Sequence, residues 1–494
     1  MEDRFGRVKS SVAPEILSLL EKRASPTQSA VASYYCQTLI HRAHVVMLAE
    51  QGILTKQEAA SILKGILKVA EEAKGNARLV TYMATEAALI QKIGEVGGKM
   101  HIGRSRNDLG HTQQRMYYRD QIERVIGEVI NYRKALLRKA EETLDAVMPG
   151  YTHWRQAQPI TLGHYLVAHA DAAARTIERL EDAYKRTNLN PLGSAALAGT
   201  GWPVDRLRTA ELLGFSDLCE NTIDAVASHD YVVEVASALA IHMSDMSRLA
   251  EDLQMWSSED FQLVDLDEAY AGTSSIMPQK KNPSSLEMVK RFAAESIGVL
   301  VTAVTSVKGT SYTNIQDREG IEPVMFDTVV GCTSIMAGVV STLIPLKENM
   351  LLKARKGFST MTEVADMLVR SFGLTFRQAH DLIAEVTSRA MSEGKAADQI
   401  LPEMVEEAAL ISLGKKLVVP EESLKAATDP VENVKRRRNI GGPAPEEVRR
   451  MIMDRWERVN AEESRHIKRL EALEAAYNAL AEAEKRIFEH PEVQ

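Results

Sequence analysis

A long stretch without proline limits the fold of this chain more than any other feature. No proline occurs between Pro26 and Pro149, and Ala, Leu, Glu and Arg, which favour helix, recur throughout. The breaks in this stretch come at glycines, as in residues 94–103, rather than at strand-like turns. Strand-like alternation is almost absent from the whole chain, so we expect a mainly α fold.

Several segments carry the apolar spacing of long helices. The spacing predicts helices over residues 29–49, from near 108 to near 144, and over 162–184, 230–256, 286–307 and 323–343. Thr55 and Glu58 form a capping box that predicts a further helix. Loops are expected at 149–159 and 189–203, with a short helix opening at Asp205.

The order of these segments predicts three parts. We expect an N-terminal helical domain over residues 1–107, a central bundle of long helices over 108–350 and a C-terminal helical domain over 351–494. Helices beyond about residue 351 are shorter and are separated by prolines. The last helix, over about 445–487, is strongly charged, so we expect it on the surface.

Charge and cysteine usage exclude several classes of protein. The net charge of −8 argues against a general nucleic-acid binder, and we interpret the basic run 435–438 as a solvated face. No signal peptide and no apolar run of membrane-spanning length are evident. Cys36, Cys219 and Cys332 form no CxxC pair, so we expect reduced structural thiols, no metal, no cofactor and a cytoplasmic location.

The segment 269–287 concentrates polar chemistry in a stretch that cannot be regular helix. Gly272, Pro278 and Pro283 disfavour helix there. Two adjacent serines, two lysines and an asparagine supply donors and potential nucleophiles. A polar loop between rigid helices is a common place for binding and catalysis. On composition alone, an ordinary surface loop is an equal alternative.

The run Gly-Thr-Ser-Ser-Ile-Met-Pro-Gln-Lys-Lys-Asn-Pro, residues 272–283, closely resembles the signature of the fumarase/aspartase superfamily of lyases. It is most similar to the argininosuccinate lyase branch. Further matching blocks follow in the expected order at residues 103–108, 151–153, 157–159 with 191–193, and 441–445. The resemblance covers nearly the whole chain. It implies a three-domain α fold whose long-helix bundle forms a tetramer core.

The resemblance also implies a reaction: anti elimination that cleaves the carbon–nitrogen bond of an N-substituted aspartate and releases fumarate. Ser274 matches the family's base, which must be activated because serine is a weak base. Lys280 and nearby loop amides are the groups that would activate it and hold the carbanion-like intermediate. His153 matches the residue acting on the leaving group, although a lone histidine is more often structural. Glu287 matches a partner for that histidine, and it also completes a possible helix-capping box with Ser284.

The remaining site positions implied by the resemblance bind the small-molecule substrate. A guanidinium gives a bidentate grip on a carboxylate that a lysine cannot reproduce, and a helix N-terminus adds backbone donors. Lys281 is interpreted as a solvated lysine, while Arg104, His101 and Gln158 have structural alternatives. The substrate-binding set is Arg106, Asn107, Thr152, Ser275, Met277, Asn282 and Gln316.

These residues come from regions far apart in the sequence. In the family, three subunits of a homotetramer each contribute one region to every active site. From the residues alone the argument is weaker: the predicted helices are too apolar for a monomer surface, which suggests burial in an oligomer.

The half of the site that would hold the amine departs from argininosuccinate lyases. Where those enzymes have a Ser and an Asp near the N-terminus, this chain has Pro26 and Ala30, and His229 replaces an Arg. Tyr312 matches a family Tyr across a small deletion, and Gln316 to Arg318 roughly match a family Gln and Lys. Other segments resemble ethylenediamine-disuccinate lyases, although Ser284 replaces an expected Asp.

The leading hypothesis is therefore an argininosuccinate lyase-like carbon–nitrogen lyase, with a diamine adduct as the alternative substrate. A fumarase or aspartase is disfavoured by the blocks at 103–108 and 441–445. A non-catalytic, crystallin-like protein on the same scaffold is disfavoured because the catalytic residue types are retained. Release of fumarate distinguishes the enzymes from the structural protein.

Overall fold

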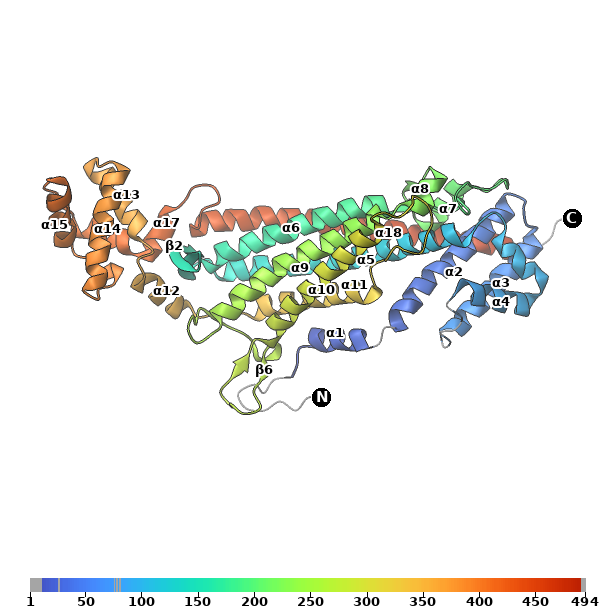
Figure 1. The fold of residues 1–494 in the computed structure, drawn as a ribbon, viewed down its shortest axis with the longest axis horizontal. Coiled ribbons are helices and arrows are strands. Elements are labelled where there is room, and N and C mark those ends of the chain that lie inside the picture. The colour runs from blue at the N-terminus through green and yellow to red at the C-terminus, as the bar shows by residue number, and fades with distance from the viewer. Residues whose placement is uncertain (1–10, 25–26, 75, 77–78, 80, 490–494) are drawn as a thin grey trace.

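The computed structural model describes residues 11–489 except 25–26, 75, 77–78 and 80, and it leaves the side chains of residues 24–32 undescribed. A bundle of long helices runs through the middle of an elongated molecule, with shorter helices at both ends (Figure 1). The mainly α fold expected from the sequence is confirmed.

The central bundle is built from five long helices. On α5, Met116, Ile122, Val125, Val129 and Leu136 are all fully buried, because their spacing places them on one apolar face. The helix starts and ends agree with the sequence prediction to within a few residues. The five helices are α5 (Arg106–Glu142), α6 (Leu162–Thr187), α9 (Asp230–Trp256), α10 (Ser284–Val307) and α11 (Pro323–Thr342).

Shorter helices pack at the N-terminal end. The predicted capping box is present: the Thr55 hydroxyl accepts from the Glu58 amide, and the Glu58 carboxylate accepts from the Thr55 amide. The glycine-rich segment expected as a loop contains a 3-10 helix, η2. The elements are α1 (Pro14–Ala24), α2 (Thr27–Glu50), α3 (Lys56–Ala73), α4 (Tyr82–Ile93) and η2 (Glu95–His101), with α7 (Arg206–Leu213) and α8 (Thr222–Ala227) later in the chain.

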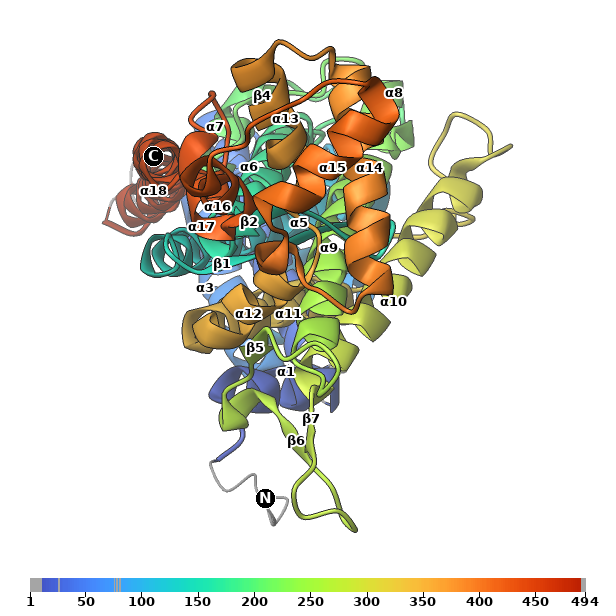
Figure 2. The same ribbon diagram turned by 90° about the vertical axis from the view of Figure 1, so that its left-hand side faces the viewer.

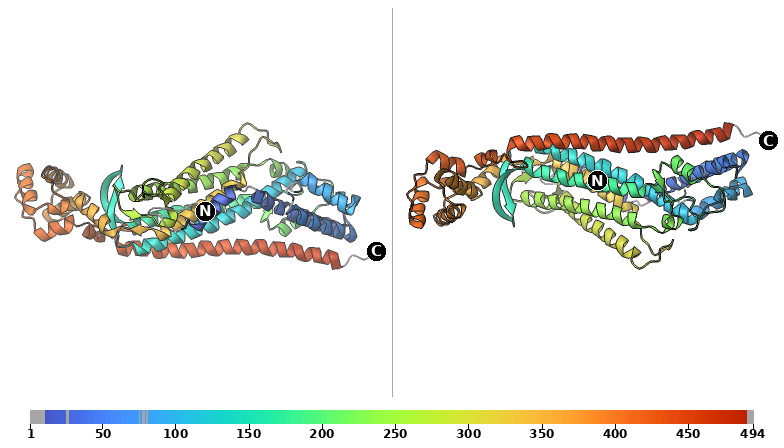
Figure 3. Two further views of the ribbon diagram at one scale, coloured as in Figure 1. Left: turned by 90° about the horizontal axis from the view of Figure 1, so that it is seen from below. Right: turned by 90° about the horizontal axis from the view of Figure 1, so that it is seen from above.

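The C-terminal third forms a small second core and then returns to the bundle. Residues between Val364 and Ala427 bury their own apolar cluster. The helices are α12 (Lys347–Lys356), α13 (Met361–Phe372), α14 (Phe376–Ser392), η4 (Ala397–Gln399), α15 (Pro402–Leu413), α16 (Glu421–Thr428), α17 (Pro430–Arg436) and α18 (Pro445–Glu489). Figure 3 shows α18 running along one side of the bundle.

The surface position expected for the last helix holds for only one face of α18. Val448, Ile452, Val459 and Leu480 are buried and belong to the large central core. The charged face then pairs across to the bundle, as in the contact between Arg455 and the Asp171 carboxylate on α6 at 3.0 Å. Helix α18 therefore closes the long bundle.

The prediction of a loop at residues 149–159 is wrong. Strands β1 (Val147–Thr152) and β2 (Arg155–Thr161) form an antiparallel hairpin there. The hairpin was not predicted because each strand contains a proline, and proline lacks the amide donor that pairs neighbouring strands. The other strands are two-residue bridges: β3 (Leu189–Asn190) with β4 (Asp217–Leu218), β5 (Val264–Asp265) with β8 (Ile344–Pro345), and β6 (Gly272–Thr273) with β7 (Lys281–Asn282).

One helix corrects the expectation that no apolar run reaches membrane-spanning length. Within the described residues, α11 has the required length and a mean hydropathy of 1.6. It lies inside the bundle, where Phe326, Val329, Ile335 and Val340 are fully buried. A core helix meets the same criterion of length and composition, and the packing of α11 against α5 and α1 identifies it as one.

Candidate active site

The loop between β6 and β7 projects from the body of the molecule (Figure 2). The pair Gly272–Asn282 closes its base, and a side chain at Gly272 would lie 2.2 Å from the Ser284 hydroxyl. A short 3-10 helix, η3 (Glu268–Tyr270), precedes the loop. The segment expected to be non-helical is therefore a narrow hairpin followed at once by α10.

The loop holds Ser274 in a local turn. Its hydroxyl accepts from the Met277 amide at 3.0 Å, and the Lys280 amide donates to the Met277 carbonyl at 3.1 Å. The Asn282 side-chain amide donates to the Thr273 carbonyl at 3.1 Å. Ser275, Met277 and Lys280 are exposed on the same loop. The loop thus presents Ser275, Met277 and Lys280 to the outside of this chain, with Ser274 half-buried beside them.

Two expectations about residues beside this loop are corrected. Lys281 is not a solvated lysine, because its side chain is only 10% exposed and its ammonium lies 3.0 Å from the Asp265 carboxylate. The capping box of Ser284 and Glu287 is also absent. The cap residue is Pro283 without a side-chain bond, and Ser284 is already the first helical residue of α10. Glu287 is exposed one turn into that helix.

His153 lies at the tip of the β1–β2 hairpin. Thr152 pairs with Arg155, so His153 and Trp154 alone make the turn, and both have positive φ, 51° and 59°. A two-residue turn with both residues left-handed has the type I′ form, which usually contains Asn or Gly. Holding bulky residues there costs conformational energy, and such strain is concentrated at functional sites.

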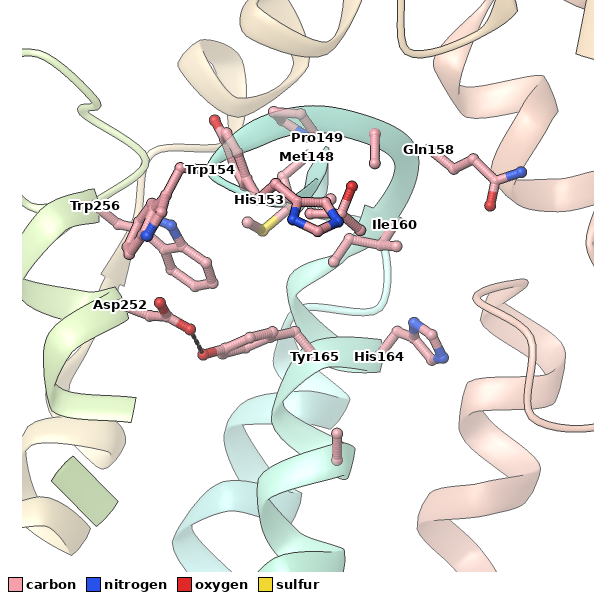
Figure 4. Close-up of a pocket in the computed structure, with 15 residues that line it drawn as sticks. Met148, Pro149, His153, Trp154, Gln158, Ile160, His164, Tyr165, Asp252 and Trp256 are labelled. Carbon is pink, nitrogen blue, oxygen red and sulfur yellow. Dashed lines mark hydrogen bonds between the residues drawn. The ribbon is translucent and has the colours of Figure 1, made fainter. Parts of the chain in front are cut away.

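A cavity of about 540 Å³ lies beneath this hairpin (Figure 4). Trp256 and Asp252, at the end of α9, stand on one wall, and Tyr165 donates to the Asp252 carboxylate at 2.5 Å. Burial raises the pKa of the Asp252 carboxyl group. His153 and Gln158 line the same cavity from the hairpin.

The start of α5 is fixed by a buried carboxylate. Asp108 is fully buried, and its oxygens accept from the backbone amides of the cap residue Ser105, of Leu109 in the helix, and of Gly193 and Ala195 in a distant loop. Burial raises the pKa of the Asp108 carboxyl group, and the hydrogen bonds from these backbone amides partly offset that effect. They lock the distant loop against the helix N-terminus.

That lock positions two residues of the predicted set. Arg106 and Asn107 are the first residues of α5. The Asn107 side-chain amide donates to the Ala196 carbonyl at 3.0 Å, in the loop that Asp108 holds. Arg104, just outside the helix, is buried and donates to the His41 ring at 2.8 Å, so its structural alternative fits the geometry.

Arg106, Asn107 and Gln316 line one polar cleft of about 420 Å³. Two neighbours on α5, His111 and Gln114, are not among the residues predicted from the sequence. They follow Asn107 by four and seven residues, a spacing that puts all three on one helix face and could have identified them. The cleft is lined by Arg106, Asn107, Gly110, His111, Gln114, His229, Asn314, Ile315, Gln316 and Arg318.

Two histidines of the cleft are neutral at pH 7. The His111 ring bonds Asn314 Oδ1 at 3.1 Å, and burial lowers its pKa to about 4. The His229 ring bonds the Glu319 carbonyl at 2.8 Å, and burial lowers its pKa as well. Because a carbonyl only accepts, the bonding nitrogen of His229 carries the proton. Both rings tie the loop after α10 to the cleft wall.

The residues expected near the amine half are engaged within this chain. The Arg318 guanidinium donates to the carbonyls of Ala227 and Val226 at the end of α8. The Tyr312 hydroxyl donates to the Asp224 carboxylate in the same helix. Pro26 lies outside the described residues, and the side chain of Ala30 is likewise not described.

The predicted site residues occupy three separate places in one chain. Arg106 and Asn107 begin α5, and the hairpin with Thr152 and His153 follows the other end of that 37-residue helix. At 1.5 Å per residue the helix alone is about 55 Å long. The loop with Ser274 projects from a third position (Figure 1). A single chain therefore does not bring the three groups together.

A metal centre has no support in the geometry. Within residues 11–489, apart from the few that the structure leaves out, no three His, Cys, Asp or Glu side chains are grouped so as to hold a metal ion. The three cysteines are buried and unpaired, as free thiols.

Known families match most of the chain. Residues 27–298 match the family described as Lyase, and residues 358–435 match the family described as Argininosuccinate lyase C-terminal. The argininosuccinate lyase of Methanosarcina acetivorans is 37% identical over 97% of each chain. That of Bacillus thuringiensis is 39% identical over 83% of this chain and 89% of its own.

Solved structures agree with these relatives. EDDS lyase in complex with formate has a TM-score of 0.97 and 44% identity over 99% of each chain. An EDDS lyase variant with bound fumarate has a TM-score of 0.96 and 44% identity over 99% of this chain and 98% of that one. The chain belongs to the fumarase/aspartase superfamily of lyases, in its argininosuccinate lyase branch, and is a carbon–nitrogen lyase.

Proposed function

We propose that this lyase cleaves an N-substituted aspartate by anti β-elimination into fumarate and an amine. A base takes the proton from the carbon beside one carboxylate, and the electron pair left behind forms the double bond as the carbon–nitrogen bond breaks. The departing nitrogen takes a proton from the opposite side. The main support is the hairpin loop closed by the Gly272–Asn282 pair, whose residues 275–280 are exposed and which carries the half-buried Ser274 beside them.

Ser274 serves as the base in this proposal. The Met277 amide already donates to its hydroxyl oxygen, a contact that stabilises a developing alkoxide. Lys280 on the same loop adds a positive charge near the base and the carbanion-like intermediate. Asn282 and Ser275 supply further donors, and Met277 lines the substrate.

The carboxylates of the substrate bind at helix and hairpin ends. Arg106 offers a bidentate guanidinium at the N-terminus of α5, and it acts together with the neighbouring Asn107. Thr152 and Gln316 complete the carboxylate contacts. The chain carries a net charge of −8, so its overall electric field does not attract anions. A small anionic substrate would instead be attracted locally, by the positive charge of Arg106 in this cleft.

His153 protonates the leaving nitrogen in this scheme, with Glu287 orienting it and favouring its charged form. Both side chains are exposed in the single chain. The strained hairpin tip supports a role for His153, because nothing in the fold of the hairpin requires a bulky residue with positive φ there.

We further propose a homotetramer whose active sites each combine regions from three subunits. The separation of the three groups along α5 and across the molecule supports it. Helix α10 adds a second support: Ile297, Val301 and Val304 form an exposed apolar stripe at helical spacing. A second copy of the chain would bury this stripe.

The amine part of the substrate in this proposal is not arginine. Pro26 and Ala30 offer no polar side chain for the amino-acid end of arginine. The His229 ring already donates a hydrogen bond to the Glu319 carbonyl. EDDS lyase, at 44% identity, is more similar than the argininosuccinate lyases compared above, at 37% and 39%. A diamine adduct therefore fits better than argininosuccinate. The buried free thiols support a cytoplasmic location.

Fumarate has ultraviolet absorbance, so one assay tests the proposal. Purified protein is given argininosuccinate, ethylenediamine-disuccinate and simple N-alkyl aspartates, and fumarate formation is followed. We expect release of fumarate, with kcat/KM for argininosuccinate about a hundredfold below the best substrate, since a loss of about 3 kcal/mol has that effect. Argininosuccinate as the best substrate by a wide margin would contradict the assignment of the amine.

A further inference from the structure

The charged side chains that line the polar cleft are all positive. Its charged lining consists of Arg106 and Arg318, and His111 and His229 are neutral because burial lowers the pKa of each. In the described part of the chain, the lining of this cleft contains no carboxylate. The cleft itself therefore suits the anionic half of a substrate and offers nothing to a cation.

A carboxylate outside the lining of this cleft is linked to it through neighbouring residues. Asp224 is half-buried in the first turn of α8, and the Tyr312 hydroxyl donates to it. Arg318, which lines the cleft, donates to the carbonyl of Ala227, three residues and about one helical turn beyond Asp224. The Arg318 guanidinium also acts electrostatically on the Tyr312 phenol, so the pair of Tyr312 and Asp224 lies close to the cleft lining.

The partner of this carboxylate, Tyr312, lies at the protein surface. The tyrosine is 67% exposed, and its bond to Asp224 raises the pKa of the phenol to about 12, so it remains a donor at neutral pH. A carboxylate has several acceptor positions and can bind an ammonium group without losing the tyrosine. Tyr312 lies two residues before Asn314, which lines the cleft.

Resting on the proposed function, we infer that Asp224 recognises a positive charge on the amine half of the substrate. The anionic aspartate half lies against Arg106 in the cleft, and a second ammonium group on the amine extends past Arg318 and bonds Asp224. The substrate class is therefore an N-substituted aspartate whose substituent carries its own cation, as a diamine adduct does.

Asp224 would supply the acceptor for a cation that the N-terminal segment lacks. Pro26 and Ala30 give no acceptor side chain for a cation. Asp224 also has a purely structural alternative, since an acidic residue in the first turn stabilises a helix through the helix dipole. The two roles differ in one respect: only recognition depends on the charge of the amine.

Two substrates of equal shape separate these roles. N-(2-aminoethyl)aspartate and N-propylaspartate differ by an ammonium group in place of a methyl group. We expect the wild-type protein to have a higher kcat/KM for the aminoethyl compound. Asp224→Asn should lower that value about fivefold, mainly through KM, and should change the value for the propyl compound by less than about twofold. Added salt should weaken the wild-type preference.

Two further variants control the experiment. Asp217→Asn removes an exposed carboxylate on β4, outside the cleft, and should leave both substrates unchanged. Tyr312→Phe removes the hydroxyl but keeps the carboxylate, so the preference for the aminoethyl compound should persist. Loss of the preference in Tyr312→Phe but not in Asp224→Asn would overturn the inference in favour of the aromatic ring.

Two other results would overturn it. Equal losses on both substrates in Asp224→Asn would assign a structural role to the carboxylate, while the proposed elimination would stand. A wild-type protein that prefers the propyl compound would exclude recognition of a cation. A wild-type protein that releases no fumarate from any N-substituted aspartate would remove the proposed function, and with it this inference.

Discussion

His153 and Trp154 follow one another at the tip of the β1–β2 hairpin, and both backbones are left-handed. The side chain of Trp154 is 55% exposed, so its packing does not explain the conformation. Left-handed backbone costs an L-residue about 1–2 kcal/mol. The hairpin thus holds the proposed proton donor in a turn that its own sequence disfavours.

Changes at Trp154 should report this strain. We expect Trp154→Val to lower the apparent unfolding temperature, because a β-branched residue is the least tolerant of positive φ. Trp154→Gly should unfold at the wild-type temperature or above it, because glycine adopts that backbone freely. Thermal unfolding of the two variants side by side is the measurement. Equal unfolding temperatures would contradict the left-handed turn.

Asp108 should matter both for stability and for substrate binding. Asp108→Asn replaces one accepting oxygen by a donor that faces backbone amides, and we expect a loss of about 2–4 kcal/mol. The loop bearing Ala196 should loosen and release Asn107, so KM for the substrate should rise by more than kcat falls. Asp381→Asn, an exposed carboxylate in the small C-terminal core region, is the control.

A double-mutant cycle with Asn107 separates positioning from general destabilisation. If Asp108 acts through Asn107, the effects of Asp108→Asn and Asn107→Ala on kcat/KM should be strongly non-additive. Independent effects that simply add would show that Asp108 stabilises the fold without positioning the site.

Acid should destabilise the protein through buried histidines. Burial, reinforced by Arg104, lowers the pKa of both His41 and His44 well below the ordinary value. The unfolded chain therefore binds more protons than the folded one at pH values below about 6.5, and stability falls as the pH falls through that range. His101, Tyr82 and Glu86 also face this cluster.

The apparent unfolding temperature at pH 7.5 and pH 5.5 checks this. His44→Gln keeps a donor for the Ile102 carbonyl, which His44 bonds at 2.8 Å, and cannot become charged. We expect it to reduce the difference between the two pH values, whereas His380→Gln, at an exposed position, should not. An unchanged difference in His44→Gln would exclude His44 from the acid sensitivity.

Ser274→Ala should abolish elimination while leaving folding and assembly intact. The Ser274 hydroxyl accepts a hydrogen bond from the Met277 amide of its own loop, and Ser274 is not part of the buried core, so its removal should disturb no core packing. We expect less than a few per cent of wild-type turnover, with an unchanged unfolding temperature and oligomer size. Ser392→Ala, on α14, serves as the control. Substantial activity in Ser274→Ala would mean that another group is the base.

Local patterns predicted the helices well because burial and local spacing agree in them. The limits of α9, Asp230 and Trp256, follow from its apolar spacing and its short flanking turns. The hairpin was missed because its turn residues, His153 and Trp154, carry no turn signal. The box at Ser284 failed because Pro283 stands one position earlier, at the helix cap.

The site was predictable in part for the same reason. Arg106, Asn107 and Gln316, which were predicted to bind the substrate, line one cleft. The engagement of Arg318 with carbonyls of α8, and of Tyr312 with Asp224, depends on contacts about 90 residues apart in the sequence. Sequence spacing carries no information on such contacts.

Mixing two inactive variants tests the central claim, a site shared between subunits, most directly. Ser274→Ala and His153→Asn are purified, dissociated together in equal amounts and reassembled, with mixed tetramers verified by mass. If different subunits supply the two residues, about one quarter of the sites receive both intact residues, and about one quarter of wild-type activity should return. No activity in verified mixed tetramers would contradict the shared site, because a site built within one chain never regains both residues.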